Sequence, residues 1–369
     1  MIKISRSKLR FPGFKGVWRK RKLGECCSIN KGQQLSKKDM LFDGKYYVLN
    51  GGIKPSGYTD KYNTDKYTIS ISEGGNSCGY INFNTEKFWS GGHNYTLSKL
   101  KVNLLFLYQF LKANEKFIMS LRIGSGLPNI QKNRLEVVDV CYPTESEQQK
   151  IGTFFSKLDT LITLQQNKIE AIKKYKAGML QKMFPREGET VPEIRFPGFI
   201  EEWEKRKFSD IFSFERPDNY TVKQDEYSND YTMPVLTANK AFILGYTKEN
   251  SPYTENSIIF DDFTLECKYV DFPYMVKSSA IKILTVKDTR KDDLRFSFER
   301  LNTTKIEPLG HVRHYISVVQ PTETKTPSLL EQQKIGAFFQ TLDNLINFHQ
   351  REYDKLKELK KGLLQQMFV

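Results

Sequence analysis

Polar side chains beside glycine pairs are the groups in this sequence best suited to reading another molecule by hydrogen bonding. Gly74-Gly75-Asn76 and Gly91-Gly92-His93-Asn94 place amide and imidazole groups next to backbone that favours turns. Asn and Gln can pair bidentately with adenine in the major groove of DNA, and Arg and Lys can pair with guanine. Such clusters predict contacts to DNA bases, although ordinary turn or surface chemistry also accounts for any single residue.

The candidate contacts are polar, basic and tyrosine side chains near such turns, with aromatic residues interleaved. In the first half of the chain they are Lys31, Gln33, Gln34, Asn50, Lys54, Asn76, Ser77, His93, Asn94, Arg122, Ser125 and Asn129. In the second half they are Arg216, Thr237, Asn239, Lys240, Lys277, Ser278, Arg313, His314 and Tyr315. The trios Lys20-Arg21-Lys22 and Lys205-Arg206-Lys207 recur in both halves, so we expect them to contact phosphates or a partner subunit rather than bases.

The charge of the chain favours a polyanionic partner. Its 369 residues include 57 Lys and Arg against 43 Asp and Glu, a formal net charge of +14, although a basic surface without a specific partner would give the same value. The net charge is +12 for residues 1–147, +5 for 148–184, −4 for 185–330 and +1 for 331–369. We therefore expect the first half to supply most of the attraction, and the second to rely on a local basic face or on a partner subunit for phosphate contacts.

Sequence strings that could support catalysis are incomplete. Asp271-Phe-Pro-Tyr274 lacks the first proline of the Asp-Pro-Pro-aromatic sequence of an amino-methyltransferase, and no Phe-x-Gly-x-Gly cofactor loop accompanies it. Pro217-Asp218 and Glu266-Cys-Lys268 match a magnesium-dependent nuclease pattern only across a long gap. The sequence has no ATP-binding P-loop and no evident nucleophile with its base. We expect a non-catalytic chain; a stand-alone nuclease or methyltransferase, and a coiled-coil adaptor that binds no DNA, are the alternatives.

The cysteines and histidines predict neither a disulfide framework nor a metal site. The five cysteines have no repeated Cys-x-x-Cys or Cys/His spacing and the four histidines are scattered, which indicates reduced thiols and a cytoplasmic protein. No run of about 18 apolar residues predicts a membrane helix. The N-terminal residues lack the apolar segment of a secretion signal.

An internal repeat organises the chain. Arg10-Phe-Pro-Gly-Phe14 recurs as Arg195-Phe-Pro-Gly-Phe199 at an offset of 185, and Glu147-Gln-Gln-Lys-Ile-Gly152 recurs as Glu331-Gln-Gln-Lys-Ile-Gly336 at an offset of 184. Over residues 148–184, 19 of 37 positions are identical to their partners without a gap. The chain is therefore a tandem duplication whose ends match closely, while residues 25–145 and 210–325 have diverged. Two reading domains on a common frame would vary in this way.

The matched segments at 148–184 and 331–369 predict long helices. Alternating steps of four and three residues are the heptad seam of a coiled coil. The apolar seam residues are Ile151, Phe155, Leu158, Ile162, Ile169, Ile172, Met179 and Met183 in the first copy, and Ile335, Phe339, Leu342, Ile346, Tyr353, Leu356, Leu363 and Met367 in the second. The polar seam positions Gln165, Lys176, His349 and Lys360 can fix register and orientation. We expect the helices to pack on each other, most simply antiparallel; amphipathic helices packed on their own domains are the alternative.

Each diverged middle is predicted to be a compact α/β or α+β unit. Alternating or continuous apolar runs predict strands at Lys66–Ser72, Ser257–Phe260 and Ala280–Val286. Helical spacing of apolar residues predicts a helix over Asn103–Ser120. The order of the strands does not follow from these patterns.

Several short sequences combine with this duplicated frame. They are the opening Leu9-Arg-Phe-Pro-Gly-Phe14 with Trp18 and Leu23-Gly24, the stretch Gly124-Ser-Gly-Leu-Pro-Asn-Ile130, and Pro143 followed by Glu147-Gln-Gln-Lys-Ile151. Together with the repeat they resemble the specificity subunit of type I restriction–modification systems, over essentially the whole chain. The second half departs from the pattern, because Leu309-Gly-His-Val-Arg-His-Tyr-Ile316 stands where the first half has the stretch ending at Ile130.

The resemblance implies a mixed α/β (α+β) fold with an approximate two-fold axis. Target-recognition domains at 1–147 and 185–330 would be separated by the helices at 148–184 and 331–369, paired as an antiparallel coiled coil. Each domain would read one half of a bipartite site in double-stranded DNA. The helices would set the spacing and dock two adenine-N6 methyltransferase subunits, which motor-nuclease subunits can join. S-adenosylmethionine, ATP and magnesium would belong to these partners, with no cofactor in this chain.

Overall fold

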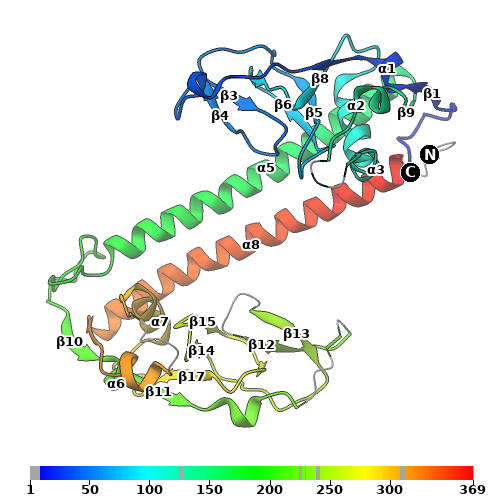
Figure 1. The fold of residues 1–369 in the computed structure, drawn as a ribbon. Coiled ribbons are helices and arrows are strands. Elements are labelled where there is room, and N and C mark those ends of the chain that lie inside the picture. The colour runs from blue at the N-terminus through cyan, green and yellow to red at the C-terminus, as the bar shows by residue number, and fades with distance from the viewer. Residues whose placement is uncertain are drawn as a thin grey trace. The chain divides into compact units, whose positions relative to one another are not determined.

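The fold consists of two compact units that share two long helices. The computed structural model describes residues 9–124, 126, 128–223, 227–228, 230–237, 242–307 and 313–368. Unit 1 comprises Met1–Gln166 with Gln350–Val369, and unit 2 comprises Asn167–His349. Helices α5 (Glu145–Lys182) and α8 (Leu329–Phe368) each contribute one stretch to each unit (Figure 1). The two long helices predicted from the repeat are therefore confirmed.

The described residues of unit 1 form three small sheets and four short helices beside the long ones. Its strands are β1 (Arg19–Lys22), β2 (Ser28–Lys31), β3 (Tyr46–Leu49), β4 (Gly57–Thr59), β5 (Thr68–Ser72), β6 (Ile81–Asn84), β7 (Trp89–Ser90), β8 (Asn94–Ser98) and β9 (Asp139–Tyr142). Its short helices are α1 (Leu23–Cys26), α2 (Leu104–Ala113), α3 (Glu115–Ser120) and α4 (Lys132–Glu136), with a 3₁₀ turn at Lys37–Asp39. The sheets have the orders β2-β8-β5-β6, β4-β3-β7 and β1-β9, and β3 and β7 are parallel.

Unit 2 repeats this topology although the two middles differ in sequence. Its strands are β10 (Glu204–Lys207), β11 (Phe212–Glu215), β12 (Met233–Leu236), β13 (Ile243–Thr247), β14 (Ser257–Asp261), β15 (Cys267–Val270), β16 (Met275–Val276), β17 (Ile281–Val286) and β18 (Glu323–Thr326). Helices α6 (Phe208–Ile211) and α7 (Leu294–Thr303), a 3₁₀ turn (Pro217–Tyr220) and a π-helical turn (Tyr315–Val319) complete it. The orders β11-β17-β14-β15, β13-β12-β16 and β10-β18 match those of unit 1, with β12 and β16 parallel. The duplication therefore extends through the diverged regions, and the mixed α/β class is confirmed.

The three strands predicted from periodicity are present as β5, β14 and β17, but the single helix predicted over Asn103–Ser120 is divided into α2 and α3. The break falls at Asn114, whose side-chain Nδ2 donates to the carbonyl of Phe110 at 2.8 Å. A short amide side chain competes for backbone acceptors in this way and favours a helix end.

The repeated aromatic residues complete the core of each unit. Phe368, near the end of α8, is fully buried, and its ring centroid lies 6.0 Å from that of Trp18 and 5.7 Å from that of Phe106. Phe184, which follows α5, takes the equivalent position in unit 2, 6.0 Å from Trp203. The end of each long helix thus closes a core that otherwise belongs largely to the other repeat.

A bidentate ion pair joins the two repeated motifs in each unit. Arg10 Nε and Nη2 donate to the two carboxylate oxygens of Glu147 at 2.9 and 2.6 Å. Arg195 and Glu331 form the same pair at 2.8 and 2.7 Å. Both glutamates are buried, and charge-assisted bidentate pairs are among the stronger polar contacts in proteins. The pairs fix the start of each long helix against the repeated Arg-Phe-Pro-Gly-Phe segment of the same unit.

The next residues of the repeated helix motif hold α2 and α7 in place. Gln148 accepts a hydrogen bond from Asn103 N at 2.9 Å and donates to Pro143 O at 2.9 Å. At Gly152, a Cβ would lie 2.8 Å from Phe106 N, which only glycine avoids. Gln332 and Gly336 have the equivalent roles in unit 2, against Asp293 and Phe296. The sequence Glu-Gln-Gln-Lys-Ile-Gly is therefore repeated for reasons of packing and hydrogen bonding.

The helices run antiparallel within unit 1. Phe155 and Phe368 have ring centroids 6.2 Å apart, whereas Asp159, one turn later on α5, pairs with Lys360, two turns earlier on α8, at 2.5 Å. In unit 2, the equivalent Lys176 and Asp343 pair at 2.8 Å.

The two polar seam lysines each therefore bind a carboxylate on the facing helix. The apolar seam residues Ile151, Phe155, Leu158, Ile169, Met183, Ile335, Phe339, Leu342 and Met367 are buried, and Ile162, Ile172, Met179, Ile346, Tyr353, Leu356 and Leu363 are half-buried. A pair of helices whose charges match at only one register resists sliding.

Among the described helices, none combines the length and the apolar character that crossing a membrane requires.

Removing Arg10 should destabilise unit 1 because it leaves the buried Glu147 carboxylate without its counter-ion. We expect Arg10→Ala to lower the free energy of unfolding by about 3 kcal/mol, the lower end of the range for a broken buried pair, since Arg10 itself is partly exposed. Urea unfolding followed by circular dichroism measures this. Lys355→Ala, which removes an exposed pair with Glu352, is the control and should have little effect. Equal effects of the two substitutions would contradict the role of the ion pair.

Candidate nucleic-acid interface

The parallel strand pair of unit 1 brings two of the predicted polar clusters together. β3 and β7 end side by side, so Asn50 and the cluster Gly91–His93 leave the same edge of the sheet. Asn50 Oδ1 accepts a hydrogen bond from His93 N at 3.1 Å, and Gly91 N donates to Leu49 O at 2.9 Å. Segments more than 40 residues apart in the sequence therefore form one loop cluster.

Glycine is required in this cluster because the loops touch each other. A Cβ on Gly91 would lie 2.4 Å from Asn50 Oδ1. Gly51 has φ +81°, and its Cβ would lie 2.8 Å from His93 O. A Cβ on Gly92 would lie 3.0 Å from Gln34 Oε1, which adds the residues after β2 to the same cluster.

The remaining loop of the cluster is held by backbone hydrogen bonds. Gly75 N donates to Pro128 O at 3.0 Å, and Gly74 and Asn129 form a β-bridge. The turn cluster at 74–76 thus lies beside Pro128 and Asn129. Ser125 falls outside the described residues.

Sequence reasoning missed Glu73, which organises the basic and aromatic groups here. Its carboxylate accepts from Lys31 Nζ at 2.8 Å and from the Tyr95 hydroxyl at 2.9 Å, and its second oxygen lies 3.9 Å from His93 Nδ1. Burial together with Glu73 raises the pKa of Tyr95, so the phenol remains a proton donor. The only sign of this role in the nearby sequence is that Glu73 directly precedes the Gly74-Gly75 pair.

Most predicted contacts of unit 1 are accessible. Lys31, Gln33, Gln34, Lys54, Asn76, His93, Arg122 and Asn129 are exposed, and Asn50 and Ser77 are half-buried. Asn94 is fully buried and donates to Ser90 Oγ at 3.1 Å, so it supports the turn and does not reach the surface. The prediction that Asn94 contacts DNA is therefore corrected, because its role is structural. For the other residues, contact with DNA stays a prediction.

Unit 2 places its candidates at the equivalent edge. Thr237 follows β12, and Lys277 and Ser278 follow β16, with Lys277 N donating to Leu236 O at 3.3 Å. This hydrogen bond is the counterpart of Gly91 N to Leu49 O in unit 1. Thr237, Lys277 and Ser278 are half-buried, and Arg216, which follows β11, is exposed. Asn239 and Lys240 fall outside the described residues.

Two candidates of unit 2 are part of the core. His314 is fully buried with Nδ1 3.0 Å from Asp262 O, and Tyr315 N donates to Asp262 Oδ1 at 2.8 Å. The Tyr315 ring, also fully buried, packs on Phe214. A side chain without exposed surface cannot contact DNA in this conformation, so both are corrected to structural residues, while Arg313 is exposed.

The repeated basic trios lie on the two-stranded sheets. Lys20 and Lys22 on β1 pair with Asp139 on β9 at 2.8 and 2.6 Å. Arg206 on β10 pairs with Asp292 at 2.5 and 2.9 Å. Part of their positive charge is therefore neutralised within the chain, which limits what they offer to phosphates.

The strings considered for catalysis do not form a centre in the described residues. Tyr274 is fully buried with its hydroxyl 2.7 Å from Ser257 Oγ, so it does not line an open site. Within the described ranges, no group of three or more His, Cys, Asp and Glu is arranged to hold a metal ion. The side chains of Cys26, Cys27, Cys78, Cys141 and Cys267 are buried.

Comparison with known proteins gives consistent matches over nearly the whole chain. Residues 16–174 and 200–358 each match the family described as type I restriction modification DNA specificity domain. A Mycoplasma genitalium protein, named a candidate type I specificity subunit, is 25% identical over 366 residues, covering 95% of this chain and 94% of its own length. The Escherichia coli EcoR124I/EcoR124II specificity subunit is 45% identical over 114 residues, covering 29% of this chain and 28% of its own.

A solved structure has the same fold. The crystal structure of the S subunit of a type I restriction–modification system from M. genitalium superimposes with a TM-score of 0.80 at 22% identity, covering 98% of this chain and 99% of that one. The fold of this chain is therefore a known one.

Adding a methyl group at Gly91 should disturb the loop cluster, because the new atom would overlap the Asn50 side chain. We expect Gly91→Ala to destabilise the protein by about 1–3 kcal/mol, measured by thermal unfolding. Gly126→Ala is the matched control from a neighbouring loop, since a Cβ there meets nothing within 4 Å. The packing of these loops would be refuted if both variants unfolded at the wild-type temperature.

Proposed function

Because the chain belongs to the family of type I restriction modification DNA specificity domains, we propose that it is the subunit that gives such a complex its DNA sequence specificity. The chain itself would be non-catalytic. The two family matches coincide with two units of the same topology, so one chain provides two recognition domains.

Each unit would read one half of a bipartite site in double-stranded DNA. The observation that carries this proposal is the equivalent loop edge of the two units, where Asn50 and the segment that begins at Gly91 in one correspond in place to Thr237 and the segment that begins at Lys277 in the other. Amide, imidazole, hydroxyl and ammonium groups on closely packed loops suit the reading of base edges. Their different residue types would give the two halves of the site different sequences.

Helices α5 and α8 would set the distance between the half-sites. At about 1.5 Å per residue, a helix of 38 or 40 residues is about 57–60 Å long. The Lys360–Asp159 and Lys176–Asp343 pairs hold the register of the helices, so the spacing would be fixed by the length of the repeat. The DNA between the half-sites would not be read.

The same helices carry two equivalent apolar surfaces that suit two copies of a partner. Outside the seam, Leu161 and Leu164 on α5 are each 50% exposed. Leu345 and Phe348 on α8, 184 residues later, are 41% and 57% exposed. Single exposed apolar residues are common, but their recurrence at equivalent positions favours a retained interface.

The partners at these surfaces would be two methyltransferase subunits, one for each copy of the repeat. Motor-nuclease subunits would join the complex through them. S-adenosylmethionine for methyl transfer to adenine, and ATP and magnesium for the motor and nuclease, would be held by those partners.

Co-expression with the cognate methyltransferase, followed by sequencing of methylated bases, tests the function. We expect a bipartite motif with one modified adenine in each half, on opposite strands, and a fixed gap. Exchange of residues 25–145 for those of a related chain should change one half only, and lengthening α5 and α8 together should change the gap only.

A continuous motif would refute the proposal of two reading units. Methylation or cleavage by this chain alone would favour the enzyme alternative, and absence of DNA affinity even with the partner would favour the adaptor.

Substitution of a charged residue into the exposed apolar surfaces should prevent docking of the methyltransferase. We expect Leu161→Asp or Leu345→Asp to reduce the complex from two methyltransferase copies to one, and the double substitution to abolish it, measured by sedimentation velocity. Thr163→Asp is the control, because Thr163 is exposed on another side of α5 and its hydroxyl bonds to the backbone of its own helix. Retention of both copies by the double variant would show that docking occurs elsewhere.

A further inference from the structure

Arg300 on α7 holds its guanidinium against the core of unit 2, and no carboxylate of the described residues pairs with it. Its Nε donates to Thr324 Oγ1 at 2.7 Å, and its Cζ lies 5.8 Å from the centroid of Phe184. Over the ranges that the structure describes, no acidic side chain forms an ion pair with it. Other shielded arginines, namely Arg10, Arg195, Arg206 and Arg295, each pair with at least one carboxylate. Desolvation lowers the pKa of Arg300 to about 10.

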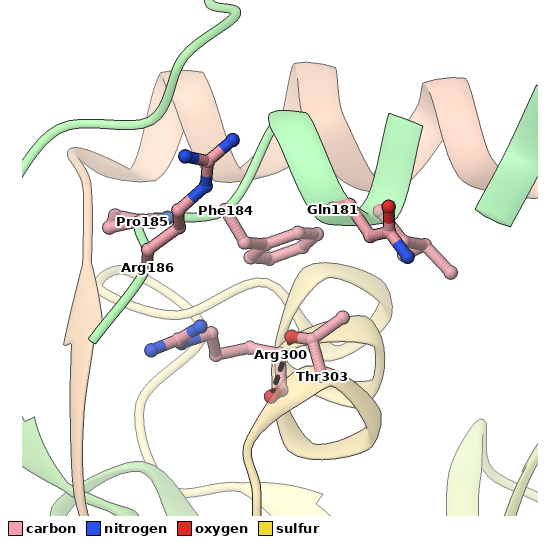
Figure 2. Close-up of a pocket in the computed structure, with 7 residues that line it drawn as sticks. Gln181, Phe184, Pro185, Arg186, Arg300 and Thr303 are labelled. Carbon is pink, nitrogen blue, oxygen red and sulfur yellow. Dashed lines mark hydrogen bonds between the residues drawn. The ribbon is translucent and has the colours of Figure 1, made fainter. Parts of the chain in front are cut away.

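A pocket of about 410 Å³ opens at this arginine. Figure 2 shows Arg300 and Thr303 of α7 on one side, with Gln181 of α5 and Phe184, which follows this helix, on the other. Leu180, Phe184 and Pro185 give it an apolar wall, and Arg186 is a further lining residue. Because Arg186 pairs with Glu193 at 2.9 Å, Arg300 is the lining cation for which the described residues supply no counter-ion.

The equivalent position of unit 1 is filled by an aromatic residue. Helices α2 and α7 begin with the same cap, in which Asn103 and Asp293 accept hydrogen bonds from the backbone N–H three residues later. Seven residues after each cap lie Phe110 and Arg300. Phe110 is fully buried, and its ring packs at 5.8 Å on that of Phe368. The shared fold therefore does not require an arginine here.

A cation that is removed from water without a counter-ion destabilises the protein. An anion bound beside it offsets this cost. We propose that this pocket receives an acidic side chain of a methyltransferase subunit, with Arg300 as its counter-ion. The inference rests on the proposed function. The apolar wall fits the methylene stem of such a side chain, and the guanidinium can bind both carboxylate oxygens.

The place of the pocket favours a protein carboxylate over a DNA phosphate. The pocket lies between the end of α5 and α7. The candidate DNA loops of unit 2 follow the paired strands β12 and β16, and β12 lies away from α7 in that unit (Figure 1). Phosphates are mostly bound by exposed cations that follow the DNA backbone. A charged side chain inserted into a walled pocket is more typical of the centre of a protein interface. The site would make the second unit's methyltransferase contact differ from that of the first.

Arg300→Phe tests the proposal in the full chain, because it installs the residue that unit 1 carries at this position. Wild-type chain should bind two methyltransferase copies. The variant should bind one copy with unchanged affinity and the other about 30-fold more weakly or worse, measured by isothermal titration calorimetry. Arg300→Lys retains a charge without the bidentate geometry and should lose less affinity, which gives a second measurement if the Phe variant unfolds. Arg290→Gln, at an exposed arginine of the same unit, is the control.

Each result bears directly on the pocket. Unchanged binding of both copies to the Arg300 variants would overturn the inference while leaving the proposed function intact. Loss of affinity for DNA with unchanged methyltransferase binding would also overturn it, and would assign the pocket to phosphate. Failure of wild-type chain to bind any methyltransferase would instead refute the proposed function itself.

Discussion

The bidentate pairs Arg10–Glu147 and Arg195–Glu331 are the contacts on which the rest of the architecture depends. Each pair joins two residues more than 130 positions apart in the sequence. It holds the Arg-Phe-Pro-Gly-Phe segment of a repeat against the first turn of a long helix. A buried carboxylate tolerates no loss of its partner, so both motifs must be retained together. The matched ends of the repeat follow from this constraint, as do the glutamine and glycine that come next in the helix.

A second constraint is that each unit depends on the end of a helix that begins in the other repeat. Phe368 completes the aromatic core around Trp18, and Phe184 completes the one around Trp203. Lys360 and Lys176 pair with the aspartates of the facing helix in the same reciprocal way. The repeats in the sequence and the compact units in space therefore do not coincide, and the helix pair is part of both cores.

This frame leaves the middles free to diverge in residue type while keeping their topology. The loop edge beside β3 and β7 recurs beside β12 and β16, but it carries a glycine-rich cluster in one unit and a lysine with hydroxyl groups in the other. Arg300 shows that divergence also reaches the helical side of the unit, where Phe110 stands in the first copy. The two units thus share a fold and differ in residue type at the proposed contact sites.

The sequence alone determined the duplication, the long helices, their seam and the mixed α/β class, because these depend on local periodicity and on comparison of the chain with itself. It also located the loops of the candidate interface through their glycines. Only the tertiary structure decided the strand order, the partners of the seam lysines, the role of Glu73, and the burial of Asn94, His314 and Tyr315. The physical reason is that burial and hydrogen-bond partners are set by residues distant in sequence: Asp262 holds His314 and Tyr315 from over 50 residues away, and no local pattern reports such a contact.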